Sequence, residues 1–104
     1  MTRRPLIALI ALTLFTGCVP ILTCYQDAIR NYTNSSFDIT WKKIIVYEPG
    51  YPRSHAIFVF YRDGGIWGQD YNYEPRYLRE VTVNSSALEI ARAFDDRAKI
   101  AKFE

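Results

Sequence analysis

The sequence predicts an α+β domain: a small antiparallel sheet of three or four strands, with one helix before it and one after it. Two observations carry this prediction. Segments 54–61 and 66–72 are rich in aromatic and β-branched residues and flank Arg62-Asp63-Gly64-Gly65, which is the pattern of a β-hairpin with a tight glycine turn. Helical spacing occurs near both ends of the chain. With 104 residues, the chain has room for one such domain.

Residues 1–17 have the layout of a secretory signal. A short basic start at 1–4 precedes an apolar core of 11 residues at 5–15, and Thr16-Gly17-Cys18 closes the pattern. We therefore expect residues 18–104 to form a single exported domain.

The run Leu14-Phe15-Thr16-Gly17-Cys18 resembles a bacterial lipobox, although the lipobox usually has leucine where this chain has Phe15. The resemblance implies that Cys18 is lipidated and becomes the first mature residue. The alternative is an uncleaved anchor, since residues 5–26 carry no charge. Both interpretations predict a domain of the bacterial cell envelope that is attached to a membrane through its N-terminus, on the periplasmic or the outer-surface side.

The two cysteines allow two interpretations. In an oxidising compartment Cys18 and Cys24 can pair, but the loop they close is small and would add little stability. If Cys18 carries lipid, Cys24 is left as a thiol that needs another explanation.

A short helix is expected at about 24–33. Thr23 and Gln26 have the spacing of a capping box, helical spacing continues to Tyr32, and Asn34-Ser35-Ser36 ends the segment. Cys24 then occupies the first turn, where the helix dipole and free amide groups favour the thiolate and lower the thiol pKa. The alternative for Cys24 is a small, buried apolar side chain.

Five further segments follow in order. We expect a half-buried strand or its lead-in at 37–41, a better buried strand at 44–47, a loop at 48–52, a break at 73–76 and a short edge strand at 81–83.

The last helix is expected at about 86–102. Ser86 and Glu89 form a second capping box, and apolar residues from Leu88 to Ala101 mark one face. The charged residues of this segment form its solvated side, and we assign them no function.

The chain's only histidine, His55, lies on the first hairpin strand. With a two-residue loop at Asp63-Gly64, position 55 faces Asn72, and Asp70 is its diagonal neighbour on the same face. If the turn centres on Arg62-Asp63 instead, position 55 faces Asp70 directly. An odd-numbered loop without a compensating bulge would send Asp70 to the other face. The turn register therefore decides whether a carboxylate can orient the imidazole. Without such a partner, a histidine at a strand start is an ordinary structural residue.

The order Cys24, His55, Asp70 supplies a nucleophile, a base and an orienting acid, which is the set that thiol catalysis needs. The helix-start cysteine, Ser-His-Ala-Ile-Phe-Val at 54–59 and Trp-Gly-Gln-Asp at 67–70 resemble transglutaminase-like, papain-like cysteine peptidases. This resemblance covers roughly residues 23–72. It implies thiol hydrolysis or acyl transfer at amide bonds, with Cys24 as nucleophile, His55 as base and Asp70 as orienting acid. For an enzyme tethered in the envelope, we expect the substrates to be peptides or peptidoglycan stem peptides.

Composition argues against two other classes of function, nucleic-acid binding and the binding of a metal or cofactor. The formal charge of +2 comes from Arg3 and Arg4, and residues 18–104 carry eleven basic and eleven acidic side chains, so no nucleic-acid partner is expected. One histidine with scattered acids gives no metal-ligand spacing, and we expect no metal and no cofactor.

The function that competes with a cysteine hydrolase is that of a non-enzymatic envelope lipoprotein, which keeps the scaffold for structural or partner-binding use. Tyrosines near the loops could serve binding under either class, or be ordinary core and rim residues: Tyr47, Tyr51, Tyr71, Tyr73 and Tyr77.

Overall fold

The computed structural model describes residues 18–50 and 53–104, with side chains from Thr23 onward, so the predictions for residues 1–17 lie outside it. Its elements are α1 (Cys18–Thr33), β1 (Lys42–Gly50), β2 (Arg53–Arg62), β3 (Gly65–Gln69), β4 (Arg76–Leu78), α2 (Ala87–Phe94) and β5 (Ile100–Phe103). The strands form one antiparallel sheet in the order β4-β3-β2-β1-β5. The predicted α+β class is confirmed, with five strands instead of three or four.

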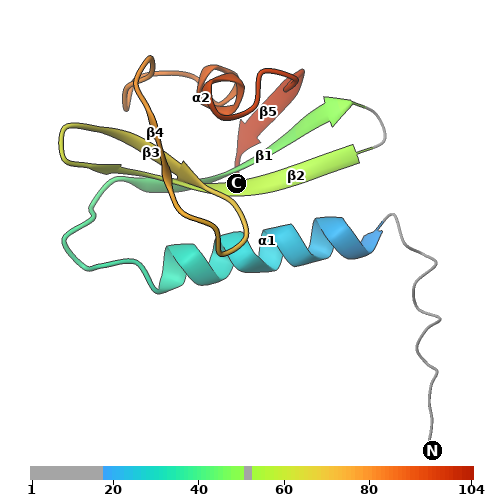
Figure 1. Cartoon of the computed structure of the whole chain (residues 1–104), viewed down its shortest axis with the longest axis horizontal. Coiled ribbons are helices and arrows are strands. Elements are labelled where there is room, and N and C mark those ends of the chain that lie inside the picture. Colours follow the sequence, from blue (N-terminus) through green and yellow to red (C-terminus); the bar gives the residue numbers. More distant parts are fainter. Residues whose placement is uncertain (1–17, 51–52) are drawn as a thin grey trace, which may run out of the picture.

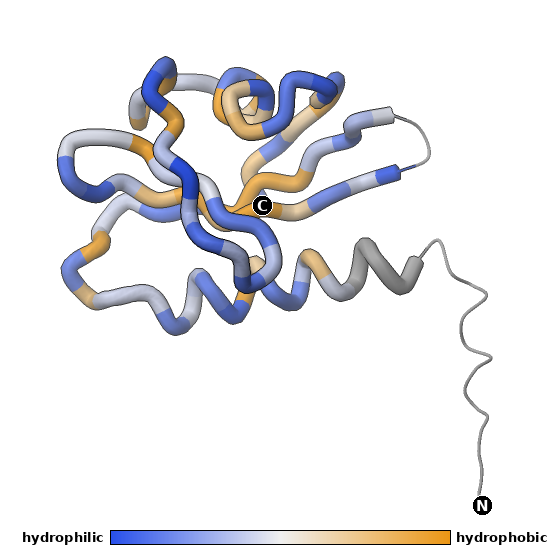
Figure 2. Tube along the Cα trace, in the orientation of Figure 1, coloured by the Kyte–Doolittle hydropathy of each residue, from blue (hydrophilic) through white to orange (hydrophobic). Residues whose placement is uncertain are grey.

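The two helices lie on opposite sides of the sheet (Figure 1). Alternation along β2 sends Ile57 and Val59 into the core beneath α2, where they meet Ile90 and other buried residues. Ala56 points the other way and packs against Cys24 and Ala28 of α1. Along the tube in Figure 2, the strands are hydrophobic at the centre of the sheet, whereas most of α1 is hydrophilic. Helix α1 buries the small side chains of Cys24 and Ala28 against the sheet, and the rings of Tyr25 and Tyr32 flank this contact.

Helix α1 starts earlier than expected. It begins at Cys18 instead of Cys24, so the predicted capping box at Thr23 is wrong, while the end at Thr33 matches the prediction. Pro20 does not prevent this start, because in the first turn of a helix its missing N–H costs no hydrogen bond. In the part of the chain that the structure describes, neither helix is long and apolar enough to cross a membrane.

The central hairpin forms around the predicted turn, but β3 ends at Gln69, so the last three residues of the predicted 66–72 strand are loop. Arg62 pairs with Gly65 across a two-residue loop. Asp63 and Gly64 have φ angles of 53° and 84°, as a type I′ turn requires. The turn sets the whole β2–β3 register, including the pair of Phe58 with Gln69.

The segment 37–41 is the lead-in to β1 and not a strand itself, and the predicted edge strand at 81–83 is a loop, because local side-chain bonds compete with the ladder. The segment 37–41 has no strand assignment; Ser36 donates to the Asp38 carboxylate, and Phe37 is 98% exposed. The segment 81–83 belongs to a turn in which the Asn84 N–H donates to the hydroxyl of Thr82.

Strand limits also differ from the expected ones. β1 continues to Gly50, so the first three residues of the predicted 48–52 loop are strand, and its last two lie outside the described residues. β4 begins at Arg76, the last residue of the predicted break.

The predicted helix at 86–102 is half right. Its capping box at Ser86 and Glu89 is present, but α2 ends at Phe94. Asp95 ends it with an extended backbone, and its carboxylate accepts from the Arg97 N–H at 3.1 Å. The chain then turns and pairs β5 with the outer edge of β1. This pairing covers a strand edge that would otherwise be exposed, and helical periodicity in the sequence cannot reveal such a long-range contact.

Gly64→Ala should destabilise the fold, because a Cβ disfavours the φ of 84° although nothing lies within 4 Å of it. We expect a loss of about 1 kcal/mol in the free energy of unfolding, measured by urea denaturation. Gly50→Ala is the matched control, since its Cβ also meets nothing within 4 Å and its φ is not positive. Equal losses in both variants would contradict the assigned turn.

Candidate active site

His55 and Asp70 form a hydrogen-bonded pair. His55 Nε2 lies 3.0 Å from Asp70 Oδ2, and the two side chains are 16% and 22% exposed. Asp70 is the first residue after β3. Continuing the β2–β3 register by one position sets it opposite Ile57, two residues from His55 on the same face. The predicted diagonal contact is therefore present, and it depends on the two-residue turn.

The His55 ring lies between two tyrosine rings. Tyr47, its partner on β1, meets it edge-on at 5.6 Å between centroids, and Tyr71 lies at 5.3 Å. Tyr47 donates its hydroxyl proton to Asp95 at 2.9 Å. Burial and this carboxylate raise the pKa of Tyr47, so its phenol stays neutral. The imidazole is thus held by an acceptor at Nε2 and by aromatic walls.

The Asp95 carboxylate, at the C-cap of α2, forms an ion pair with Arg97. The Arg97 side chain donates to both of its oxygens, at 3.0 and 2.9 Å. These bonds, with smaller contributions from the Arg97 N–H and Tyr47, hold the pKa of Asp95 well below its usual range against the effect of burial. Asp95 is therefore an anion that anchors Tyr47 beside His55.

Cys24 is buried, with 1% of its surface exposed. It packs against Ala28 and Ala56, with Tyr25 and Tyr71 at the margin of the cluster. Burial raises the pKa of the thiol, while the backbone N–H groups of Ala56, Cys24 and Tyr25 act in the opposite direction. The expected lowering of the pKa is wrong because Cys24 lies in the second turn of a longer helix and is desolvated.

The structure brings His55 and Asp70 together but places Cys24 on the opposite face of β2, because His55 and Ala56 are adjacent strand residues that point to opposite faces. Cys24 contacts Ala56 from the α1 side, and the His55 ring contacts Tyr47 of the core beneath α2. β3 stops pairing with β2 at Phe58, so it does not cover the edge of β2 at Ala56. Tyr71 belongs to both groups, since it packs against the Cys24 cluster and against the His55 ring. Burial, Cys24 and Asp70 all raise the pKa of Tyr71.

The loop after β3 is tied down by two side-chain amides. Asn31 of α1 donates from Nδ2 to the Tyr71 carbonyl at 2.7 Å, and Gln69 donates from Nε2 to the Tyr73 carbonyl at 2.8 Å. Tyr71 has a φ of 50°, a left-handed conformation that is uncommon for a bulky residue. Sequence reasoning missed Asn31 and the role of Tyr71, because a bond between residues 40 apart leaves no local signal.

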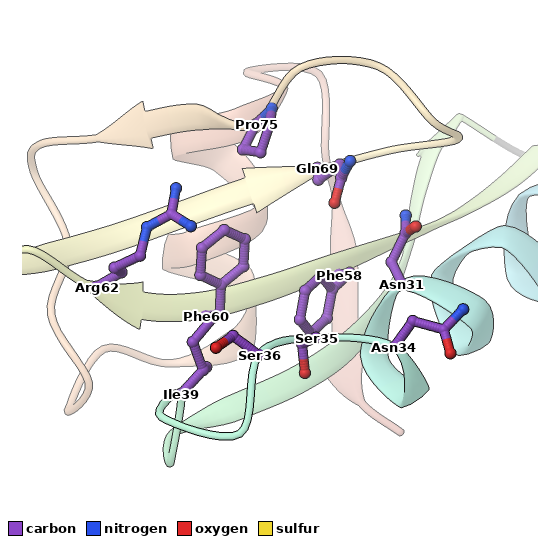
Figure 3. Close-up of a pocket in the computed structure, with 10 residues that line it drawn as sticks. All are labelled: Asn31, Asn34, Ser35, Ser36, Ile39, Phe58, Phe60, Arg62, Gln69 and Pro75. Carbon is purple, nitrogen blue, oxygen red and sulfur yellow. The ribbon is translucent and has the colours of Figure 1, made fainter.

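A pocket of about 240 Å³ lies farther along the α1 side of β2 (Figure 3). Phe58 and Phe60, which stack with centroids 5.0 Å apart, line it together with amide, hydroxyl and guanidinium groups. Its residues are Asn31, Asn34, Ser35, Ser36, Ile39, Phe58, Phe60, Arg62, Gln69 and Pro75. Every second residue of β2 points to the same face, so one face carries Ala56, Phe58 and Phe60. The pocket and Cys24 both lie on that face.

Within residues 18–50 and 53–104, no group of three or more histidine, cysteine, aspartate or glutamate side chains is arranged to hold a metal ion. Comparisons with protein-family models, with curated proteins and with solved structures found no match.

Titration of Cys24 should make stability depend on pH above 9. The folded protein holds the thiol proton more tightly than the unfolded chain does, since burial raises the pKa from its ordinary value of 9.0. The stability contributed by the neutral thiol is present below this pH and is lost as the pH rises toward the folded-state pKa. Urea denaturation at pH 8 to 10.5 should show wild type losing more stability than Cys24→Ala.

The two proteins share their buried tyrosines, so the difference between their curves isolates Cys24. Parallel curves across this range would contradict a raised thiol pKa.

Proposed function

We propose that this chain is a membrane-tethered cysteine hydrolase or acyltransferase that acts on amide bonds of peptides or peptidoglycan stem peptides. The observation that carries the proposal is the 3.0 Å bond between His55 Nε2 and Asp70 Oδ2, with Cys24 packed against the adjacent residue Ala56 on the other face of β2. The chain order of helix cysteine, strand histidine and following aspartate is also that of transglutaminase-like, papain-like peptidases.

In this proposal each residue has one chemical role. Asp70 accepts the Nε2 proton of His55, which leaves Nδ1 as the basic nitrogen that takes the proton from Cys24. The thiolate then attacks the amide carbonyl carbon, and the imidazolium returns the proton to the departing amine. Water completes hydrolysis of the resulting thioester, or a second amine takes the acyl group.

The burial of Cys24 sets a requirement on this mechanism. Cys24 and His55 lie on opposite faces of β2, so the proton has to pass around the strand edge that β3 leaves open at Ala56. Tyr71 contacts the cysteine cluster and the His55 ring, so the proposal needs this ring to move when substrate arrives. The raised thiol pKa is consistent with a neutral resting state that is activated only when the imidazole approaches.

The pocket beside Phe58 and Phe60 offers a place for the substrate chain. It lies on the Cys24 face of β2, and its lining includes side-chain amides at Asn31, Asn34 and Gln69. Amide and hydroxyl groups around an apolar floor suit a peptide, which presents N–H and C=O groups between its side chains. Tethering through Cys18 or an uncleaved anchor would hold this surface close to the membrane.

The second candidate is a non-enzymatic envelope lipoprotein. The observation that favours it is the 1% exposure of Cys24, since a purely structural cysteine is expected to be buried. In that case His55 and Asp70 stabilise the end of the hairpin, and the pocket residues serve a partner.

A thiol-reactive, peptide-amide-directed probe separates the two. We expect wild type to be labelled at Cys24, Cys24→Ser to lose that label, and Cys18→Ser to keep it. His55→Ala should slow the labelling by roughly 10²-fold or more, because it removes the base. The measurement is the labelling rate in mass spectra of the intact protein and of its peptides.

Labelling of the His55→Ala variant at the wild-type rate would exclude the imidazole from the chemistry. Turnover of a peptide substrate that survives in Cys24→Ser would exclude Cys24 as the nucleophile.

A further inference from the structure

We infer that Asn31 is a positioning residue that holds Asp70 against His55, through its bond to the Tyr71 carbonyl. Its importance for catalysis rests on the proposed function, whereas its effect on the His55–Asp70 pair does not.

The placement of Asn31 follows from the helix. Cys24, Ala28 and Asn31 are spaced i, i+4 and i+7, so they lie on one face of α1. The first two side chains are small and buried against Ala56, which brings the helix backbone close to the sheet. Two turns after Cys24, this close approach places Asn31 Nδ2 at 2.7 Å from the carbonyl of Tyr71.

The bond acts on the residue that follows Asp70. Tyr71 has a φ of 50°, a conformation that a bulky residue keeps only where the surroundings hold it. Beyond it, the Tyr73 N–H donates to the Asp70 carbonyl at 3.1 Å, and Gln69 holds the Tyr73 carbonyl. These hydrogen bonds within the loop fix its conformation, and the bond from Asn31 attaches the loop to α1.

Helix α1 therefore positions both parts of the proposed site, Cys24 and the His55–Asp70 pair. The same helix face carries Cys24 and, through Asn31, sets the backbone next to Asp70. Releasing the loop from α1 should therefore loosen the carboxylate from the imidazole, although Asn31 touches neither group.

The experiment reads the His55 ring directly. In protein labelled with ¹⁵N-histidine, a hydrogen bond to Asp70 slows exchange of the Nε2 proton, so its ring ¹H–¹⁵N signal is observed in mildly alkaline buffer. The chain has one histidine, so this signal is unambiguous. We expect wild type to show it and Asp70→Ala to lose it.

Asn31→Ala should reduce the intensity of the signal roughly twofold or more, because the loop opens more often. Asn31→Asp has nearly the same size but lacks the N–H donor at this pH, and it should act in the same direction. Gln26→Ala is the matched control: it removes an exposed amide from the same helix and should leave the signal unchanged. Backbone amide spectra report separately whether each variant is folded.

A wild-type ring signal in folded Asn31→Ala would overturn the inference, as would the absence of this signal from wild type. The outcome is separable from that of the proposed function, because the ring signal does not require Cys24 to react. If the peptide-directed probe never labels Cys24 while Asn31→Ala still loses the ring signal, the proposed function fails and the positioning role stands.

Discussion

The two-residue turn at Asp63-Gly64 is the constraint on which the rest of the site depends. It fixes the register of β2 against β3, and that register brings Asp70 onto the same face as His55. A shift of one residue would reverse every side chain of β3 and separate the carboxylate from the imidazole. The core beneath α2 reinforces this register, because Ile57 and Ile66 are fully buried only with the present alternation.

Features set by short-range chemistry could be predicted from the sequence. Asp63-Gly64 takes positive φ angles at low cost, so the hairpin and its register followed from a dipeptide. The capping box at Ser86 and Glu89 has the same local origin. From these came the fold class and the meeting of His55 with Asp70.

Features set by distant partners could not be predicted. Residues 95–102 continue a helical pattern, but the Asp95 turn and the exposed edge of β1 convert this segment into a turn and a strand. The true start of α1 at Cys18 removed Cys24 from the first turn, and its burial raises the thiol pKa that was expected to be lowered. The bond from Asn31 to Tyr71 joins residues that no local pattern connects.

Two opposing effects act on the pKa of the Cys24 thiol, and their balance decides how readily the thiolate forms. Burial disfavours the thiolate, while nearby backbone N–H groups favour it. Close packing of α1 on Ala56 causes both, since it excludes water and brings the sulfur to the β2 backbone. Under the proposed function the thiol reacts only when the imidazole approaches, and Tyr71, which contacts the Cys24 cluster and the His55 ring, is the side chain that has to move.

The most direct test of the catalytic account is the distance from Cys24 Sγ to His55 Nδ1 in a crystal structure of the protein with a peptide aldehyde. The account predicts a thiohemiacetal on Cys24, a displaced Tyr71 ring and a separation of about 3 to 4 Å. An unmodified, buried cysteine roughly 10 Å from the imidazole, well beyond hydrogen-bond reach, would contradict it.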